Sequence, residues 1–201
     1  MIIGLTGTYC SGKNHIAGFL EKRGLPVLDV DKLGHKAIET EKNLITGRFG
    51  KDILNSDGTV NRKLLGKKVF GNPGDLAELE GIVHPKVNLE TDAWIKKHGG
   101  KACVINAALL HKSSAFANLD ALIIVRAPVL TRLLRAKKRD RLPWKEIIKR
   151  IYSQKKFSSQ YFPKKADIYI VENPGFPNFG FRRSVKPENR IDEILSFLGL
   201  G

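Results

Sequence analysis

The sequence is poor in cysteine and has no long hydrophobic run. Its two cysteines, Cys10 and Cys103, are too few for a disulfide framework, which indicates a reducing compartment. No apolar run approaches the roughly 20 residues that cross a bilayer. The apolar residues 1–5 are followed by a glycine-rich loop instead of a cleavage site, which argues against a signal peptide. We therefore expect a cytoplasmic protein without a membrane segment.

Acidic residues are also scarce. The 201 residues include 35 Lys and Arg against 20 Asp and Glu, so the formal net charge is +15. Fourteen of the basic residues lie between Arg126 and Lys165, together with two acids, Asp140 and Glu146. Such a segment suits a polyphosphate ligand, an anionic membrane or a nucleic acid, and it is also typical of a solvated helix face.

The remaining composition is that of a globular protein. Hydrophobic residues make up 42% of the chain and charged residues 27%, which excludes a disordered or fibrous chain. The length is sufficient for one α/β core with an inserted subdomain.

A phosphate-binding loop pattern follows the apolar run Ile2–Leu5. Two glycines and a lysine are spaced as Gly7-Thr8-Tyr9-Cys10-Ser11-Gly12-Lys13. Glycines let the main chain approach a ligand closely, so that successive N–H groups form an anion nest. The next helix would add the positive end of its dipole, and Lys13 a mobile charge for the outer phosphates. The alternative, a glycine-rich turn without a ligand, fits the place between strand and helix less well.

Asn14 stands where this pattern usually has a Ser or Thr whose hydroxyl binds Mg²⁺. Its amide oxygen is also a neutral hard ligand, but it lies one bond farther out. Direct coordination and a water bridge both remain open. The pattern therefore predicts a phosphate site with a weakened magnesium site.

A second short strand, over residues 25–28, leads into Asp29 and Asp31. In parallel α/β sheets, ligands bind beyond the carboxyl ends of the strands. On an extended chain, side chains two positions apart point the same way, so either carboxylate could meet a metal or a substrate hydroxyl. Asp29 is equally well explained as the cap of a helix that begins near Lys32, whereas for Asp31 we favour function.

The rest of the chain predicts an α/β fold with five strands. Residues 33–99 are mainly helical, and a helix from Asp75 to about Lys97 contains the step Val83-His84-Pro85. His84 has no metal-ligand spacing around it. Further strands are expected at 101–107, 121–125 and 167–171, with helices at 128–157, interrupted by Pro143, and at 187–198.

Several motifs together resemble the dephospho-CoA kinase family over nearly the whole chain. Besides the loop, they are the strand Pro26-Val27-Leu28-Asp29-Val30-Asp31, the step His84-Pro85, the pattern Arg135-x-x-x-Arg139-Asp140, the run Arg150-Ile151-x-x-Gln154 and the turn Asn173-x-Gly175. The phosphate loop alone marks a very large superfamily, whereas the combination is specific.

This resemblance implies a fold and a reaction. The fold would be a three-layer P-loop kinase domain over residues 1–201, with a five-stranded parallel sheet. A helical insertion at about 33–99 would receive the CoA substrate, and a basic helical lid would cover about 128–157. The reaction would transfer the γ-phosphoryl group of ATP, with Mg²⁺, to the 3′-hydroxyl of dephospho-CoA.

The resemblance also implies roles for individual residues. Asp31 would accept or orient the proton of the ribose hydroxyl, and His84 would contact the same substrate. Lys13 would hold the β- and γ-phosphates, and Arg135 and Arg139 would meet the transferring phosphoryl group. The ATP site would comprise Thr8, Tyr9, Cys10, Ser11, Gly12, Lys13, Asn14, His15, Asn173 and Gly175, with Asn14 as the Mg²⁺ ligand.

Four departures from the family pattern stand out. Asn14 replaces the usual Ser or Thr, His15 replaces Thr, and His111-Lys112 replaces Phe-Glu. Residues 176–186, which interleave aromatic and basic side chains, form a longer link than the family has. Such a segment could bind a base or a nucleic acid, but we interpret it as a packed loop.

Two alternative functions follow from these departures. One is another small-substrate P-loop kinase, acting on a nucleoside or nucleotide. The other is a P-loop protein that has lost the chemistry and binds nucleic acid through its basic segment. The joint presence of Lys13, Asp31, Arg135 and Arg139 argues against nucleic acid. We expect ATP and dephospho-CoA as partners, and a monomer or a small homo-oligomer.

Overall fold

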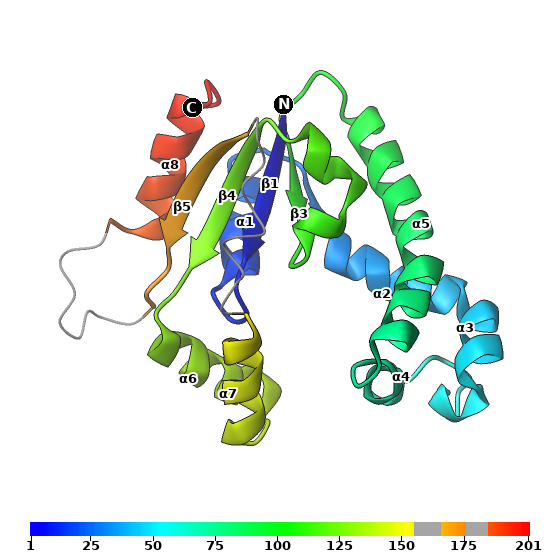
Figure 1. Cartoon of the computed structure of the whole chain (residues 1–201). Helices are drawn as coiled ribbons and strands as arrows, with labels where there is room; N and C mark the ends of the chain where they lie inside the picture. Colours follow the sequence, from blue (N-terminus) through cyan, green and yellow to red (C-terminus); the bar gives the residue numbers. More distant parts are fainter. Residues whose placement is uncertain (155–165, 176–184) are drawn as a thin grey trace. The chain divides into compact units, whose positions relative to one another are not determined.

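The computed structural model describes residues 1–154, 166–175 and 185–201. The chain divides into two compact units (Figure 1). Unit 1 comprises Met1–Leu28 and Ile95–Gly201, and unit 2 comprises Asp29–Trp94, close to the expected insertion. Residues 155–157 of the expected lid and 176–184 of the aromatic and basic segment lie outside the described residues.

Unit 1 is built on a five-stranded parallel sheet of order β2-β3-β1-β4-β5, which confirms the predicted sheet. Its central strand β1 pairs in parallel with β3 and β4, and β4 pairs with β5. The strands are β1 (Ile2–Gly7), β2 (Val27–Asp29), β3 (Cys103–Asn106), β4 (Ala121–Arg126) and β5 (Asp167–Glu172). Most are short apolar runs, as strands that are covered on both faces require.

Helical elements cover both faces of the sheet. On one face, α1 (Lys13–Lys22) and α8 (Pro187–Phe197) pack together over Ile3 and Leu5 of β1. The other face is covered by the 3₁₀-helices η2 (Leu110–Lys112) and η3 (Ser114–Asn118). Leu110 of η2 and Leu119, directly after η3, pack against Gly4 of β1. A Cβ at Gly4 would lie 2.7 Å from a terminal methyl group of each leucine, so both side chains would have to shift to admit a larger residue.

Two further helices of unit 1 lie by the loop that follows β1 (Figure 1). They are α6 (Val129–Asp140) and α7 (Trp144–Ser153), and they form the described part of the expected lid. Ala136, Ile147 and Ile151 make a small apolar cluster against Tyr9 and Cys10. The lid is therefore packed on the loop and not only linked to it through the chain.

Unit 2 is helical. It contains α2 (Val30–Thr40), α3 (Lys42–Phe49), the 3₁₀-helix η1 (Lys51–Ile53), α4 (Arg62–Val69) and most of α5 (Pro73–Lys97), which carries Pro85 in its interior. Its core is separate from that of the sheet and includes Ile45, Phe49, Ile53, Leu65 and Val83. Unit 2 thus has its own apolar interior, as an inserted subdomain needs.

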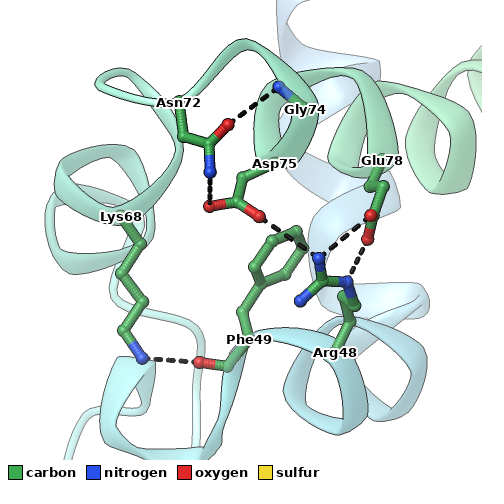
Figure 2. A network of polar contacts seen from close by, with 7 residues as sticks. All are labelled: Arg48, Phe49, Lys68, Asn72, Gly74, Asp75 and Glu78. Carbon is green, nitrogen blue, oxygen red and sulfur yellow. Dashed lines mark hydrogen bonds and ion pairs between the residues drawn. The ribbon is translucent and has the colours of Figure 1, made fainter.

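Ion pairs at the surface of unit 2 join its helices (Figure 2). Arg48 of α3 contacts both Glu78 and Asp75 of α5, and the ring of Phe49 lies 5.4 Å from its guanidinium carbon. Lys68 of α4 donates to the main-chain oxygen of Phe49 at 2.6 Å. These contacts fasten α3 to α4 and α5.

The chain does not stay extended between Asp29 and Asp31. Helix α2 begins at Val30, and the Asp29 carboxylate accepts from the main-chain N–H of Lys32 at 3.2 Å as its N-cap. The extended chain through both residues, on which the expected common direction of the carboxylates was based, is therefore wrong, because Asp31 is already helical. Asp29 caps the helix, and Asp31 lies in its first turn.

Candidate active site

The loop between β1 and α1 has the backbone of an anion nest. Gly12, the N-cap of α1, has φ 94°, and Cys10 also has a positive φ, 60°. The Ser11 N–H donates to the Thr8 carbonyl at 2.9 Å, which closes a tight turn. Because glycine is the N-cap, α1 begins without a capping side chain. The amides of its first turn are thus suited to an anion.

Packing leaves no room for side chains at the two glycines of the loop. A Cβ at Gly7 would lie 2.5 Å from the Ser11 hydroxyl oxygen and 2.8 Å from the Val125 carbonyl oxygen. A Cβ at Gly12 would collide with the Asn173 amide nitrogen. The loop shape is therefore set by neighbours from β4 and the turn after β5 as well as by its own sequence.

Lys13 and Asn14 share a partner in Asn106, at the carboxyl end of β3. The Lys13 ammonium donates to the Asn106 carbonyl oxygen Oδ1 at 2.5 Å, and the Asn106 amide donates to Asn14 Oδ1 at 3.3 Å. Asn106 is 2% exposed, whereas Lys13 is half-buried and Asn14 is exposed. Hydrogen bonds of a buried amide hold its partners in one arrangement.

Asn14 would offer a divalent cation at the loop a neutral ligand. Over residues 1–154, 166–175 and 185–201, no group of three or more His, Cys, Asp or Glu side chains is placed to hold a metal. Asn14 offers an amide oxygen, a hard ligand that Mg²⁺ accepts. Mg²⁺ bound in this way retains several waters and relies on substrate phosphates for the rest of its ligands.

Two arginines of the lid reach the loop. Arg132, 8% exposed, donates from Nε to the Tyr9 carbonyl at 2.8 Å. Arg135 donates to the main-chain oxygen of Ser11 at 3.0 Å and to the side-chain oxygen Oδ1 of Asn173 at 3.3 Å. Burial lowers the pKa of both guanidinium groups, yet arginine remains charged at any physiological pH. These acceptors are neutral, so they do not cancel the positive charge beside the loop.

Arg139 has a different environment. It forms a two-point contact with Asp140, at 2.7 and 3.1 Å, and its guanidinium carbon lies 5.2 Å from the centre of the Tyr9 ring. The hydrogen bond to Asp140 raises the pKa of Arg139, and the same bond lowers the pKa of Asp140. The Tyr9 hydroxyl also donates to Asp140. In this arrangement Arg139 is held at the loop as one member of an ion pair.

Tyr9 is held by the lid through all its polar groups. Its N–H donates to the Gln154 side-chain oxygen at 2.7 Å, its carbonyl accepts from Arg132, and its hydroxyl donates to Asp140. Burial and then the bond to Asp140 raise the pKa of the Tyr9 hydroxyl. The middle of the loop and the lid are thus joined by hydrogen bonds.

The turn after β5 completes this side of the site. Asn173, 5% exposed, donates to the Ser11 carbonyl at 2.9 Å. Gly175 has φ 78°, and a Cβ there would lie 2.9 Å from Arg135 Nη2. His15 is exposed in the first turn of α1, where its ring lies 4.5 Å from that of Phe19. Unit 1 thus brings together most of the expected site, namely Thr8, Tyr9, Cys10, Ser11, Gly12, Lys13, Asn14, His15, Arg135, Arg139, Asn173 and Gly175.

The two residues expected at the acceptor substrate belong to unit 2. Asp31 is half-buried in the first turn of α2, and His84 is half-buried in α5, directly before Pro85. One turn after Asp31 lies His35, which the sequence analysis missed. Burial, and secondarily the charge of Arg62, lowers the pKa of His35.

Sequence reasoning also missed Asn106 and Arg132. A signal for Asn106 existed, because it is a polar residue at the carboxyl end of an otherwise apolar strand, where ligands of parallel sheets bind. Arg132 gave no signal, since it is one of many basic residues on α6. The Ser11 hydroxyl is a further distinctive group, because it is fully buried without a hydrogen-bond partner among the described residues.

Comparisons with known proteins found similar sequences and structures that cover most of this chain. A family model described as dephospho-CoA kinase matches residues 1–177. A dephospho-CoA kinase from Anaeromyxobacter dehalogenans is 36% identical over 88% of this chain and 85% of its own length. A crystal structure of a Thermus thermophilus protein, 28% identical, superposes with a TM-score of 0.80 over 98% of this chain and 97% of that one.

A solved dephospho-CoA kinase from Campylobacter jejuni, 24% identical, has a TM-score of 0.66 over 98% of this chain and 96% of that one, which supports the fold. In the described part of the chain, no helix has both the length and the apolar character needed to span a membrane.

Proposed function

The chain belongs to the dephospho-CoA kinase family, and we propose on this premise that it transfers the γ-phosphoryl group of ATP to the 3′-hydroxyl of dephospho-CoA. The observation that carries the proposal is the loop of residues 7–14, with Lys13 at its end and Arg135 bonded to its carbonyls. Phosphoryl transfer has a loose transition state, so that catalysis consists mainly of positioning and charge neutralisation.

The donor side of the reaction is assigned to unit 1. The loop amides and the N-terminus of α1 bind the phosphates of ATP, and Lys13 meets the β- and γ-phosphates. Arg135 lies at the same loop, and its planar guanidinium suits the equatorial oxygens of the transferring group. Arg139 would first have to exchange its Asp140 partner for the phosphoryl oxygens.

The acceptor side is assigned to unit 2. Asp31 accepts or orients the proton of the attacking 3′-hydroxyl, and His84 contacts the same substrate. Two features support Asp31: it follows a strand at the carboxyl edge of the sheet, and the first turn of α2 fixes its main chain. His35 lies one turn after Asp31 in the same helix, and burial lowers the pKa of its imidazole.

Mg²⁺ is proposed to arrive with the nucleotide. It would contact the phosphate oxygens, with Asn14 as its neutral protein ligand, directly or through a water. The metal would supply charge neutralisation on the β- and γ-phosphates. The protein's own part is to hold the Asn14 amide oxygen in place, which Asn106 does by donating to it.

CoA formation from ATP and dephospho-CoA tests the proposal, at several Mg²⁺ concentrations and with each substrate omitted in turn. We expect a product that requires both substrates. Tight ATP binding without transfer to dephospho-CoA at any Mg²⁺ concentration would contradict the proposed acceptor and favour another small-substrate kinase. Retention on DNA or RNA with a steep salt dependence, together with absent transfer, would favour the nucleic-acid alternative.

A further inference from the structure

Among the described residues, the carboxylate of Asp140 has three partners. Arg139 makes a two-point contact with it, from Nε to Oδ1 at 2.7 Å and from Nη2 to Oδ2 at 3.1 Å. The Tyr9 hydroxyl donates to the same Oδ2, and Arg150 Nη1 lies 4.0 Å from it. Asp140, the last residue of α6, therefore links Arg139 to the phosphate loop and to α7.

Arg139 is the partner that can leave this carboxylate. The Arg139 side chain is 61% exposed, whereas the Asp140 side chain is 19% exposed. An ion pair with one exposed partner is held weakly, because water competes for the exposed group. Phosphoryl transfer needs the Arg139 guanidinium at the transferring group, so the arginine has to exchange its partner. The Asp140 carboxylate then remains in a largely covered place.

Tyr9 and Arg150 lower the cost of that exchange. A covered carboxylate that loses its partners is unfavourable, because it has lost water as well. The bond to Arg139 is the main cause that lowers the pKa of Asp140, and the Tyr9 hydrogen bond and the charge of Arg150 act in the same direction. These two groups stabilise the ionised carboxylate already, and they remain beside it when Arg139 leaves.

The Tyr9 hydroxyl is placed by contacts that do not involve the hydroxyl itself. The Tyr9 N–H donates to Gln154 at 2.7 Å, and its carbonyl accepts from Arg132 at 2.8 Å. The centre of its ring lies 5.2 Å from the guanidinium carbon of Arg139 and 5.9 Å from that of Arg150. The phosphate-loop pattern specifies no residue at position 9, so it assigns no role to this tyrosine.

We propose that Tyr9 and Arg150 are positioning residues that hold Asp140 when Arg139 moves to the transferring phosphoryl group. They make the ion pair easier to break and keep the carboxylate at the end of α6. The proposal rests on the proposed function, because it takes phosphoryl transfer as the step that draws Arg139 away. It extends that function by assigning the release of Arg139 to two further side chains.

The test is CoA formation at saturating dephospho-CoA and Mg²⁺, with ATP varied, in a double-mutant cycle. Tyr9→Phe removes the hydroxyl and keeps the ring and both main-chain contacts. We expect its kcat to fall by about fivefold or more, part of the strength of a hydrogen bond to a charged group, and its KM for ATP to change less than about twofold. Arg139→Gln removes the group that is released, so adding Tyr9→Phe to it should lower kcat no further.

A second variant and two controls accompany the cycle. Arg150→Gln keeps a donor without the charge and should lower kcat by about threefold or more, whereas Arg150→Lys keeps the charge and should restore most of that loss. Tyr169→Phe, in β5 where the ring packs on the core of the sheet, and Lys149→Gln, at an exposed position of α7, should leave kcat unchanged. Thermal unfolding shows whether each variant is folded at the assay temperature.

The outcomes are distinguishable. The inference is wrong, although transfer stands, if Tyr9→Phe has the kcat of the parent, or if it lowers kcat equally in the parent and in Arg139→Gln. A rise in KM for ATP as large as the fall in kcat also overturns it, because the hydroxyl would then serve binding at the loop. If Tyr9→Phe does not fold, the same cycle with Arg150→Gln decides. If the parent forms no CoA, the proposed function itself fails and the inference with it.

Discussion

Two arginines beside the phosphate loop of unit 1 and one arginine of unit 2 have partners of different kinds. In unit 1, Arg132 and Arg135 donate to carbonyl oxygens of the phosphate loop, whereas Arg48 of unit 2 contacts two carboxylates, Asp75 and Glu78. The net charges of the two units also differ. Unit 2 has ten Lys and Arg against eleven Asp and Glu, a net charge of −1, and unit 1 has the other 25 basic and nine acidic residues, a net charge of +16.

The difference shows how one residue type can serve a ligand or a fold. A guanidinium that is bonded to carbonyls keeps its full charge, and its field acts on whatever anion enters the loop. A guanidinium that is paired with carboxylates is neutralised, and at an exposed surface it contributes little beyond fastening two helices. The positive charge of the chain therefore belongs to the unit that contains the phosphate loop.

The largest effect is expected from Lys13→Ala, which removes the mobile charge of unit 1. Both ATP affinity and turnover should fall, with turnover reduced on the order of a thousandfold, because Lys13 would act on the phosphates in the ground state and the transition state. Calorimetry and a CoA-formation assay measure the two quantities. Unchanged ATP affinity would show that the charge of unit 1 does not serve the phosphates.

Asp31→Asn should separate the chemistry of unit 2 from the binding of unit 1. We expect turnover to fall by about a hundredfold or more, as for loss of a general base, while ATP affinity changes less than about twofold. The change keeps the shape and the first-turn position of the side chain. Turnover equal to that of the parent protein would remove the role assigned to Asp31.

Arg135→Gln tests the carbonyl-bonded arginine directly. The amide can still donate to a loop carbonyl but has no charge, so ATP affinity should fall by about tenfold at low salt. The loss should shrink as salt rises, because salt screens the interaction. A matched Lys145→Gln variant, at an exposed position of α7, is expected to change ATP affinity much less.

The smallest effect is expected from Arg48→Gln in unit 2. Losing the exposed contacts with Asp75 and Glu78 should lower the melting temperature by a few degrees at most. ATP affinity should stay the same, because these contacts fasten α3 to α5 (Figure 2). A clear change in ATP affinity in this variant would break the contrast between the two units.

Local patterns in the sequence were sufficient to predict the loop and the five strands along the chain. The spacing of Gly7, Gly12 and Lys13 is a short-range signal, and the structure places each of them as this signal requires. The geometry of Asp29 and Asp31 was predicted wrongly, because the helix begins at Val30 and not near Lys32. A difference of two residues at a helix start is within ordinary uncertainty, yet it redirects a side chain.

Contacts between distant parts of the chain could not be predicted in this way. Asn106 is hydrogen-bonded to Lys13, 93 positions away in the sequence, and Gln154 is hydrogen-bonded to Tyr9, 145 positions away. No periodicity links such pairs, since only the packing of the sheet and the lid brings them together. The basic residues of α6 look alike in sequence, and only their depth in the fold separates the buried Arg132 from the exposed Lys138.

The hold of the lid on Tyr9 has a consequence for the chain as it is synthesised. Tyr9 is translated well before its partners Arg132, Asp140 and Gln154. At elongation rates of about 5–20 residues per second, this delay is on the order of ten seconds. Until Gln154 has emerged, a nascent chain has the sequence of the phosphate loop without the contacts that shape it. A chain truncated before the lid would therefore be expected to bind ATP poorly, although every residue of the loop is present.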